Sequence, residues 1–197
     1  MTYFFKAMLI GLLTVSSLGQ VTAQVPQGPG EQPYYHSTPE KINDLIDTKL
    51  DVRFDYPKSW LYGKEWVTLK PHFYPTDSLK LDARYMDIEK IAIVSNGQMT
   101  PLQYQYDSIH LNIKLDRLYK RNERYMIYIA YTSKPNNVHD RPGFKMDGKG
   151  LWFINPTGAD PDKPTQIWTQ GEAESSSCWF PTIDHPNQKT TDQISIT

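Results

Sequence analysis

The chain has 197 residues, of which 39% are hydrophobic and 13% aromatic, and its formal net charge is -1 at pH 7. This composition allows one domain with a buried core, and the 13 tyrosines and 5 tryptophans favour strands over helices. So small a charge provides no field that would attract nucleic acid or an acidic membrane surface, and we predict no nucleic-acid partner.

The amino-terminal residues 1–23 have the pattern of a signal peptide. Lys6 is their only charged residue, and it precedes an apolar run over residues 7–15. Small residues up to Ala23 then stand where signal peptidase cleaves. The alternative is a membrane anchor, but the apolar run is too short to cross about 30 Å of hydrocarbon. We therefore expect cleavage after Ala23 and a periplasmic or extracellular protein without a stable membrane anchor.

The next segment, residues 24–35, is predicted to be a flexible leader, because its first part, QVPQGPGE, is rich in proline and glycine. The folded domain is expected over residues 36–197. Cys178 is the only cysteine, so no intramolecular disulfide can form. The aromatic neighbours Trp179 and Phe180 favour a buried thiol.

Most of the domain consists of short segments in which apolar and polar residues alternate, which is the pattern of half-buried strands. In chain order, the predicted strands are 48–55, 66–69, 79–83, 88–94, 102–106, 109–115, 125–132, 151–153 and 166–168. Asn96-Gly97 favours a tight hairpin because both residues tolerate positive φ. Residues 125–132 are the most apolar strand and are expected at the centre of a sheet. The best helical candidate, residues 39–46, is short and would lie outside the sheet.

Strands at intervals of roughly 8–12 residues predict an all-β fold, either a β-sandwich or an open barrel. Residues 191–197 begin another alternation, around Ile194 and Ile196, and stop before a turn or cap. Because strands seldom end in mid-pattern, we expect the domain to be incomplete at its carboxyl-terminal end.

The sequence offers no recognisable catalytic or metal-binding motif. None of the five histidines belongs to an H-E-x-x-H motif, and no G-x-S-x-G, P-loop or dinucleotide-binding glycine pattern occurs. The run SSSC at residues 175–178 contains possible nucleophiles, but a proline-rich loop separates it from His185 and no positioned base is evident. We therefore predict neither a catalytic residue nor a metal ligand in this chain.

Three polar side chains alternate after the predicted strand 166–168, namely Gln170, Glu172 and Glu174. If the chain stays extended, all three point to the same side. Unpaired carboxylates at a strand end can receive a substrate ammonium, since charge-assisted hydrogen bonds are about twice as strong as neutral ones. The alternative is a solvated polar edge, which the residues alone favour.

Residues 169–189, TQGEAESSSCWFPTIDHPNQK, resemble part of the amino-terminal domain of the gluzincin zinc aminopeptidases, the aminopeptidase N and leukotriene-hydrolase family. Members carry T-Q-x-[QE] at a strand end, then small and charged residues, and then [WF]-F-P-x-x-D-x-P-x-x-K. The spacing agrees without a gap, and the order of the predicted strands agrees over nearly all of the chain after the leader.

The resemblance implies a β-sandwich or saddle-shaped domain of antiparallel sheets, and it also implies roles for individual residues. Glu172 is expected to hold the free α-ammonium of a peptide substrate, with Gln170 beside it. The motif that follows is expected to be a structural turn in which Asp184 hydrogen-bonds locally. The residues of this turn are Trp179, Phe180, Pro181, Asp184 and Pro186. Most members have an Ala-Arg-Arg-like run where this chain has SSC at residues 176–178, so the ion pairs of those arginines are absent and the packing of the turn is in question.

In this family a thermolysin-like catalytic domain follows, with a G-x-M-E-N loop and an H-E-x-x-H zinc helix, and neither motif occurs in the chain. The resemblance implies zinc in the complete family member, none in this chain, and no peptidase activity from the chain alone. It also implies peptide substrates with a free amino terminus and the missing catalytic domain as partner. The alternative is a free-standing secreted β-sandwich that binds a glycan or a protein without catalysis.

Overall fold

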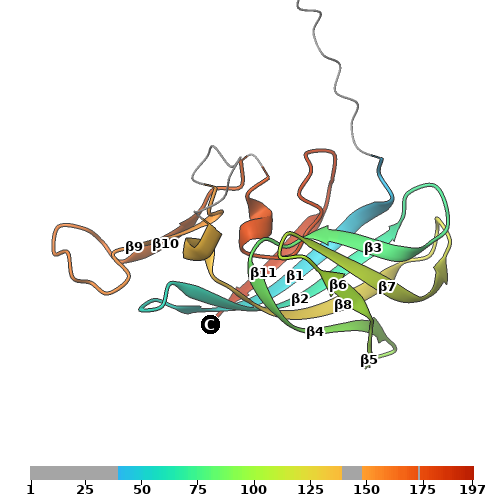
Figure 1. Cartoon of the computed structure of the whole chain (residues 1–197), viewed down its shortest axis with the longest axis horizontal. Helices are drawn as coiled ribbons and strands as arrows, with labels where there is room; N and C mark the ends of the chain where they lie inside the picture. The colour runs from blue at the N-terminus through green and yellow to red at the C-terminus, as the bar shows by residue number, and fades with distance from the viewer. Residues whose placement is uncertain (1–39, 139–147, 173) are drawn as a thin grey trace, which may run out of the picture. The chain divides into compact units, whose positions relative to one another are not determined.

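The computed structural model describes residues 40–138, 148–172 and 174–197 (Figure 1). The predicted signal peptide, the predicted leader and the first residues of the predicted domain lie outside these ranges. Within them the chain forms eleven strands and two short 3-10 helices, which confirms the predicted all-β class. Neither of the described helices is long and apolar enough to cross a membrane.

Six strands form the larger sheet, in the order β11-β1-β2-β8-β4-β5. Paired neighbours are antiparallel, except that β1 and β11 are parallel. The most apolar strand, β8, pairs with β2 on one side and β4 on the other, which confirms its predicted central position. The strands are β1 (Asn43–Asp55), β2 (Trp60–Pro71), β4 (Met86–Ser95), β5 (Gln98–Pro101), β8 (Tyr125–Ser133) and β11 (Thr191–Ile196).

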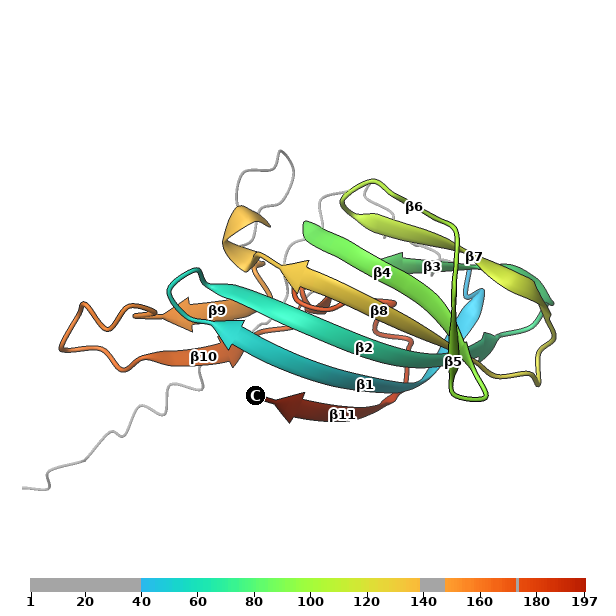
Figure 2. The ribbon, with the colours of Figure 1, turned by 90° about the horizontal axis from the view of Figure 1, so that it is seen from below.

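A second sheet of three strands, in the order β3-β7-β6, lies over one face of the larger sheet (Figure 1, Figure 2). In β7, Leu111, Ile113 and Leu115 are buried, whereas Asn112 and Lys114 between them are exposed. The buried side chains of both sheets form one hydrophobic core. The alternation that predicts the strands therefore also sets which face of each strand is buried. The strands of this sheet are β3 (Thr76–Asp82), β6 (Tyr104–Tyr106) and β7 (His110–Tyr119).

The turn between β4 and β5 is the tight hairpin predicted at Asn96-Gly97. The backbone φ is 50° at Asn96 and 76° at Gly97, and a type I′ turn requires positive values at both positions. Ser95 and Gln98 pair directly across the turn. This prediction is confirmed.

The helix predicted over residues 39–46 is wrong for the part that the structure describes, because Asn43 already begins β1. Leu45 pairs with Leu69 of β2, and the Tyr125 hydroxyl donates a 2.6 Å hydrogen bond to Asn43 Oδ1. These long-range partners outweigh the weak helical preference of a segment that is too short to form a stable helix alone.

Two further strands, β9 (Leu151–Ile154) and β10 (Gln166–Thr169), form a separate hairpin that extends away from both sheets (Figure 1, Figure 2). One face of this hairpin bears Phe153 and Ile167, which pack against the hydrophobic core. The ring centre of Phe153 lies 6.1 Å from that of Phe54. The remaining elements are the 3-10 helices η1 (Pro135–Val138) and η2 (Ser176–Cys178).

Candidate functional site

Gln170 and Glu172 lie directly after β10, on the turn that leads to η2. The Gln170 backbone N–H donates to Gly150 O at 3.0 Å, so the pairing of the hairpin continues one residue past β10. The Gln170 side-chain nitrogen Nε2 donates to Glu172 Oε2 at 3.2 Å. Both residues are exposed. The structure therefore brings the two predicted binding residues together, with an amide that orients an accessible carboxylate.

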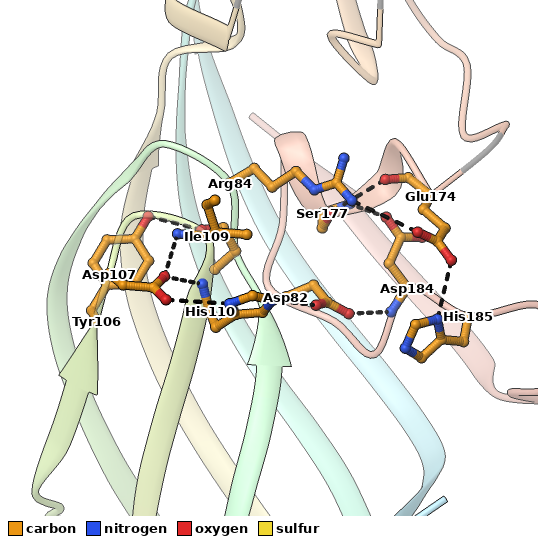
Figure 3. Close-up of polar contacts among 11 residues, drawn as sticks. Asp82, Arg84, Tyr106, Asp107, Ile109, His110, Glu174, Ser177, Asp184 and His185 are labelled. Carbon is orange, nitrogen blue, oxygen red and sulfur yellow. Dashed lines mark hydrogen bonds and ion pairs between the residues drawn. The ribbon is translucent and has the colours of Figure 1, made fainter. Parts of the chain in front are cut away.

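Glu174 does not join this pair, so the prediction that all three side chains share one side is wrong. The chain turns after Gly171, whose carbonyl accepts the Ser175 N–H at 2.9 Å, and Glu174 has a φ of 61°. Its carboxylate lies 3.2 Å from His185 Nδ1 and 3.8 Å from Arg84 Nη2 (Figure 3). The strand alternation fails here because a turn follows β10.

Two glycines allow this turn to lie close to its neighbours. Gly150 has a φ of 65°, and a Cβ atom at this position would lie 1.9 Å from Ser175 O. A Cβ atom at Gly171 would lie 2.8 Å from the Ser176 hydroxyl oxygen. A side chain at Gly150 would therefore strain the backbone and push the turn, with Glu172, away from the hairpin.

The segment after η2 is tied to the second sheet by hydrogen bonds around Asp184 (Figure 3). Asp184 Oδ2 accepts the Ser177 N–H at 2.8 Å, and the Asp184 N–H donates to Asp82 Oδ2 at 3.0 Å. The backbones of Asp82 and Thr182 also exchange two hydrogen bonds, of 2.6 and 2.9 Å. Burial raises the pKa of Asp184, and the hydrogen bond from Ser177 opposes this shift. Asp184 thus makes the local contacts that the family motif implies.

Most other residues of the predicted structural turn pack inward. Trp179 and Phe180 contact each other edge to face, with ring centres 4.4 Å apart, and both pack against the hydrophobic core. Pro181 is buried, whereas Pro186 is exposed. The turn therefore fixes the chain that follows Glu172 to the body of the domain.

Cys178 is fully buried, which confirms the prediction from its aromatic neighbours. Its Sγ atom donates to Gly148 O at 3.0 Å, and its carbonyl accepts a hydrogen bond of 2.8 Å from the Ser133 hydroxyl of β8. Burial raises the pKa of the thiol to about 11. The thiolate that a cysteine nucleophile needs is therefore not formed at neutral pH.

Arg84 belongs to this region, although the sequence pattern does not reveal it. Its backbone N–H donates to Ser177 O at 2.7 Å, and its guanidinium, only 13% exposed, reaches Glu174 (Figure 3). The turn thus has a cation beside it, although its own residues 176–178, SSC, provide none. No spacing in the sequence could have identified Arg84, because the contact depends on how β3 packs beside η2.

A pair of tryptophans lies next to Gln170 on the same hairpin. Trp152 of β9 and Trp168 of β10 are directly opposite in the strand register. Their rings are stacked, with centres 5.5 Å apart and planes inclined by 10°, and Trp168 is 43% exposed. Because side chains alternate along an extended chain, Trp168 and Gln170 lie on the same face of the hairpin.

The described residues do not fit a zinc ion. In the ranges that the structure describes, no group of three or more His, Cys, Asp or Glu side chains could hold a metal ion. Three histidines in these ranges each contact a carboxylate instead. The pairs are His72 with Asp44, His110 with Asp107, and His185 with Glu174.

The fold is similar to those of solved M1 zinc metallopeptidases. A two-domain M1 zinc metallopeptidase bound to L-arginine aligns with a TM-score of 0.63 and 14% identity, over 80% of this chain and 33% of that chain. An M1 zinc metallopeptidase from Deinococcus radiodurans gives 0.59 and 17%, over 80% and 32%. Native yeast LTA4 hydrolase gives 0.58 and 22%, over 86% and 25%. This chain therefore spans about a quarter to a third of the length of these proteins.

The sequence itself shows the family. The family model described as the Peptidase M1 N-terminal domain matches residues 32–197. This chain therefore belongs to the Peptidase M1 N-terminal domain family, which confirms the resemblance carried by residues 169–189. No curated protein matches the chain.

Proposed function

We propose that this chain is the amino-terminal substrate-pocket domain of an exported zinc metallo-aminopeptidase, an enzyme that removes amino-terminal residues from peptides. The observation that carries the proposal is the Gln170–Glu172 pair, an accessible carboxylate hydrogen-bonded to an amide at the end of β10. In this proposal, zinc and the catalytic groups belong to a thermolysin-like domain outside this chain.

The Glu172 carboxylate has the chemistry to bind a free amino terminus. An α-ammonium carries a positive charge over much of the neutral range, and hydrogen bonds to charged groups contribute about 1.5–3 kcal/mol. The Gln170 amide holds one carboxylate oxygen of Glu172, which leaves the other oxygen for a ligand. A peptide with a blocked amino terminus cannot form this charge-assisted bond, so the site favours removal of residues from the amino-terminal end.

The isolated 197-residue chain is expected to release no amino acid from aminoacyl-anilides, with or without added zinc. A zinc peptidase needs its metal to generate the nucleophilic water, and the part of the chain that the structure describes offers no donor set for one. A chromogenic anilide assay with zinc, and a parallel assay with a chelator, measures this. Zinc-dependent hydrolysis by the purified chain would contradict the proposal.

Sequencing the gene beyond the codon for Thr197 separates the proposed enzyme from a free-standing binding module. A reading frame that continues into an H-E-x-x-H motif supports the enzyme. A stop codon at that point rejects the enzyme and favours a secreted module that binds a glycan or a protein.

Export is the second part of the proposal, and it rests on Lys6, the apolar residues 7–15 and the small residues before Gln24. When the chain is expressed in a bacterium, we expect to recover it from the periplasm or the medium with Gln24 as its first residue. Cell fractionation followed by intact mass spectrometry measures this. A cytoplasmic protein that retains Met1 is the result that rejects export.

A further inference from the structure

We propose that the stacked Trp152–Trp168 pair is an apolar wall that receives the side chain of an amino-terminal residue whose α-ammonium lies at Glu172. The ligands favoured by this site are then peptides that begin with an aromatic or other large uncharged apolar residue. This inference rests on the proposed function and adds the side-chain class that the site selects.

The first observation is that the hairpin exposes its larger aromatic side chains. Phe153 and Ile167, on one face of the hairpin, pack against the core, whereas Trp152 and Trp168 lie on the other face. Trp168 remains 43% exposed, and no ring or cation from the described ranges contacts it apart from Trp152. The stacked pair therefore offers an accessible aromatic surface against which an uncharged side chain can pack.

The second observation is the short path from the aromatic pair to the carboxylate. Trp168 and Gln170 are two residues apart in extended chain, so their Cα atoms lie roughly 6.6 Å apart, at about 3.3 Å per residue. Gln170 in turn donates to Glu172. An ammonium at Glu172 and an aromatic ring against Trp168 can therefore belong to one amino-terminal residue.

The third observation indicates whether the amino-terminal residue of the ligand has an aromatic or a cationic side chain. Lys149 Nζ lies 5.1 Å from the centre of the Trp152 ring, so a cation already occupies this end of the pair. A lysine or arginine side chain at the wall would compete with Lys149 for the Trp152 ring. An uncharged ring can stack on tryptophan without this competition, and aromatic pairs contribute about 0.5–1.5 kcal/mol beyond the area that they bury.

The test measures how the ¹⁵N-labelled 197-residue chain binds small amides, by NMR titration of its indole and backbone N–H signals. The ligands are L-phenylalanine amide, L-alanine amide, L-arginine amide and N-acetyl-L-phenylalanine amide. We expect phenylalanine amide to bind about 5- to 10-fold more tightly than alanine or arginine amide. Trp168→Ala should remove this preference, and Glu172→Gln should weaken the binding of all three free amines to a similar extent. Tyr74→Ala, which removes a 77% exposed aromatic side chain from the β2–β3 loop, is the matched control and should change neither.

The outcomes separate the inference from the proposed function. A preference for phenylalanine amide that survives Trp168→Ala overturns the inference, and so does equal binding of phenylalanine and alanine amides. In both cases, weaker amine binding in Glu172→Gln still supports the proposed function. If the acetylated amide binds as tightly as the free amine, and its binding depends on Trp168, the apolar wall is supported and recognition of the ammonium group by Glu172 is rejected. If no ligand shifts any signal of the hairpin, the inference is rejected, and the proposed function is decided separately by the kinetics of Glu172→Gln in the longer enzyme.

Discussion

Glu172→Gln, made in the longer enzyme whose pocket we propose this domain to complete, is expected to lower kcat/KM for free-amino substrates by about 10- to 100-fold, mainly through a higher KM. The substitution keeps the shape of the side chain and removes the charge that would meet the α-ammonium. A hydrogen bond to a charged group contributes about 1.5–3 kcal/mol, which corresponds to this range of rate constants. Steady-state kinetics with an unblocked aminoacyl-anilide measures the effect.

Glu174→Gln is the matched control, because it makes the same chemical change two residues further along the chain. The Glu174 carboxylate is directed at His185 and Arg84, away from the Gln170–Glu172 pair, so we expect this variant to keep most of kcat/KM. Equal losses in both variants would indicate a general disturbance of the turn. An unchanged kcat/KM in Glu172→Gln would reject the proposed role of this carboxylate.

Glu65→Leu is expected to stabilise the domain by about 1–3 kcal/mol, because the wild-type residue is a buried carboxyl group without a partner. Glu65 lies on the core side of β2 and is 0% exposed. Neither of its carboxylate oxygens has a hydrogen-bond partner within the described ranges, and the same holds for the nearby Tyr131 hydroxyl. For a domain of this size, each 1 kcal/mol corresponds to a rise in Tm of about 2–4 °C. Thermal and urea unfolding of both proteins measure the difference.

The same residue makes the stability of the wild-type domain depend on pH. Burial raises the pKa of Glu65 well above its ordinary value of 4.5. Between the unfolded and folded pKa values the folded state binds more protons, so the free energy of unfolding falls as pH rises. The part of the free energy of unfolding that depends on Glu65 protonation is therefore fully present below about pH 4.5. It is lost as pH rises through the folded pKa of Glu65, by at most about 1.4 kcal/mol per pH unit.

Glu65→Gln separates the two effects, because it cannot ionise but still buries a polar group. We expect this variant to lose the part of the pH dependence between pH 5 and pH 8 that Glu65 causes, while gaining less stability than Glu65→Leu. If wild type and Glu65→Gln lose stability in parallel over this range, another group causes the pH dependence.

The strands could be predicted from sequence because their side-chain alternation is a local property that survives in the folded domain. β7 and the Asn96-Gly97 hairpin follow directly from it. The start of β1 could not be predicted in this way, because Asn43 is held by Tyr125, a partner far along the chain.

Only part of the candidate site could be predicted, because the rest depends on contacts between segments that are distant in the chain. The family motif identifies Gln170 and Glu172 as neighbours, and their side chains do meet. The position of Glu174 depends on a turn packed beside Gly150. The stacking of Trp152 on Trp168 depends on the register of a hairpin whose strands are joined by a loop, and periodicity does not specify that register.

The parallel pairing of β1 with β11 has a consequence for the order in which the domain folds. Asp47 pairs with Thr191, a contact between residues 144 positions apart. The edge of β1 that faces β11 therefore stays unpaired until residues 191–196 are available, and contacts of such long range slow folding. An unpaired strand edge also invites association with other chains. A nascent chain thus carries an exposed edge on β1 until residues 191–196 have been made and have paired with it.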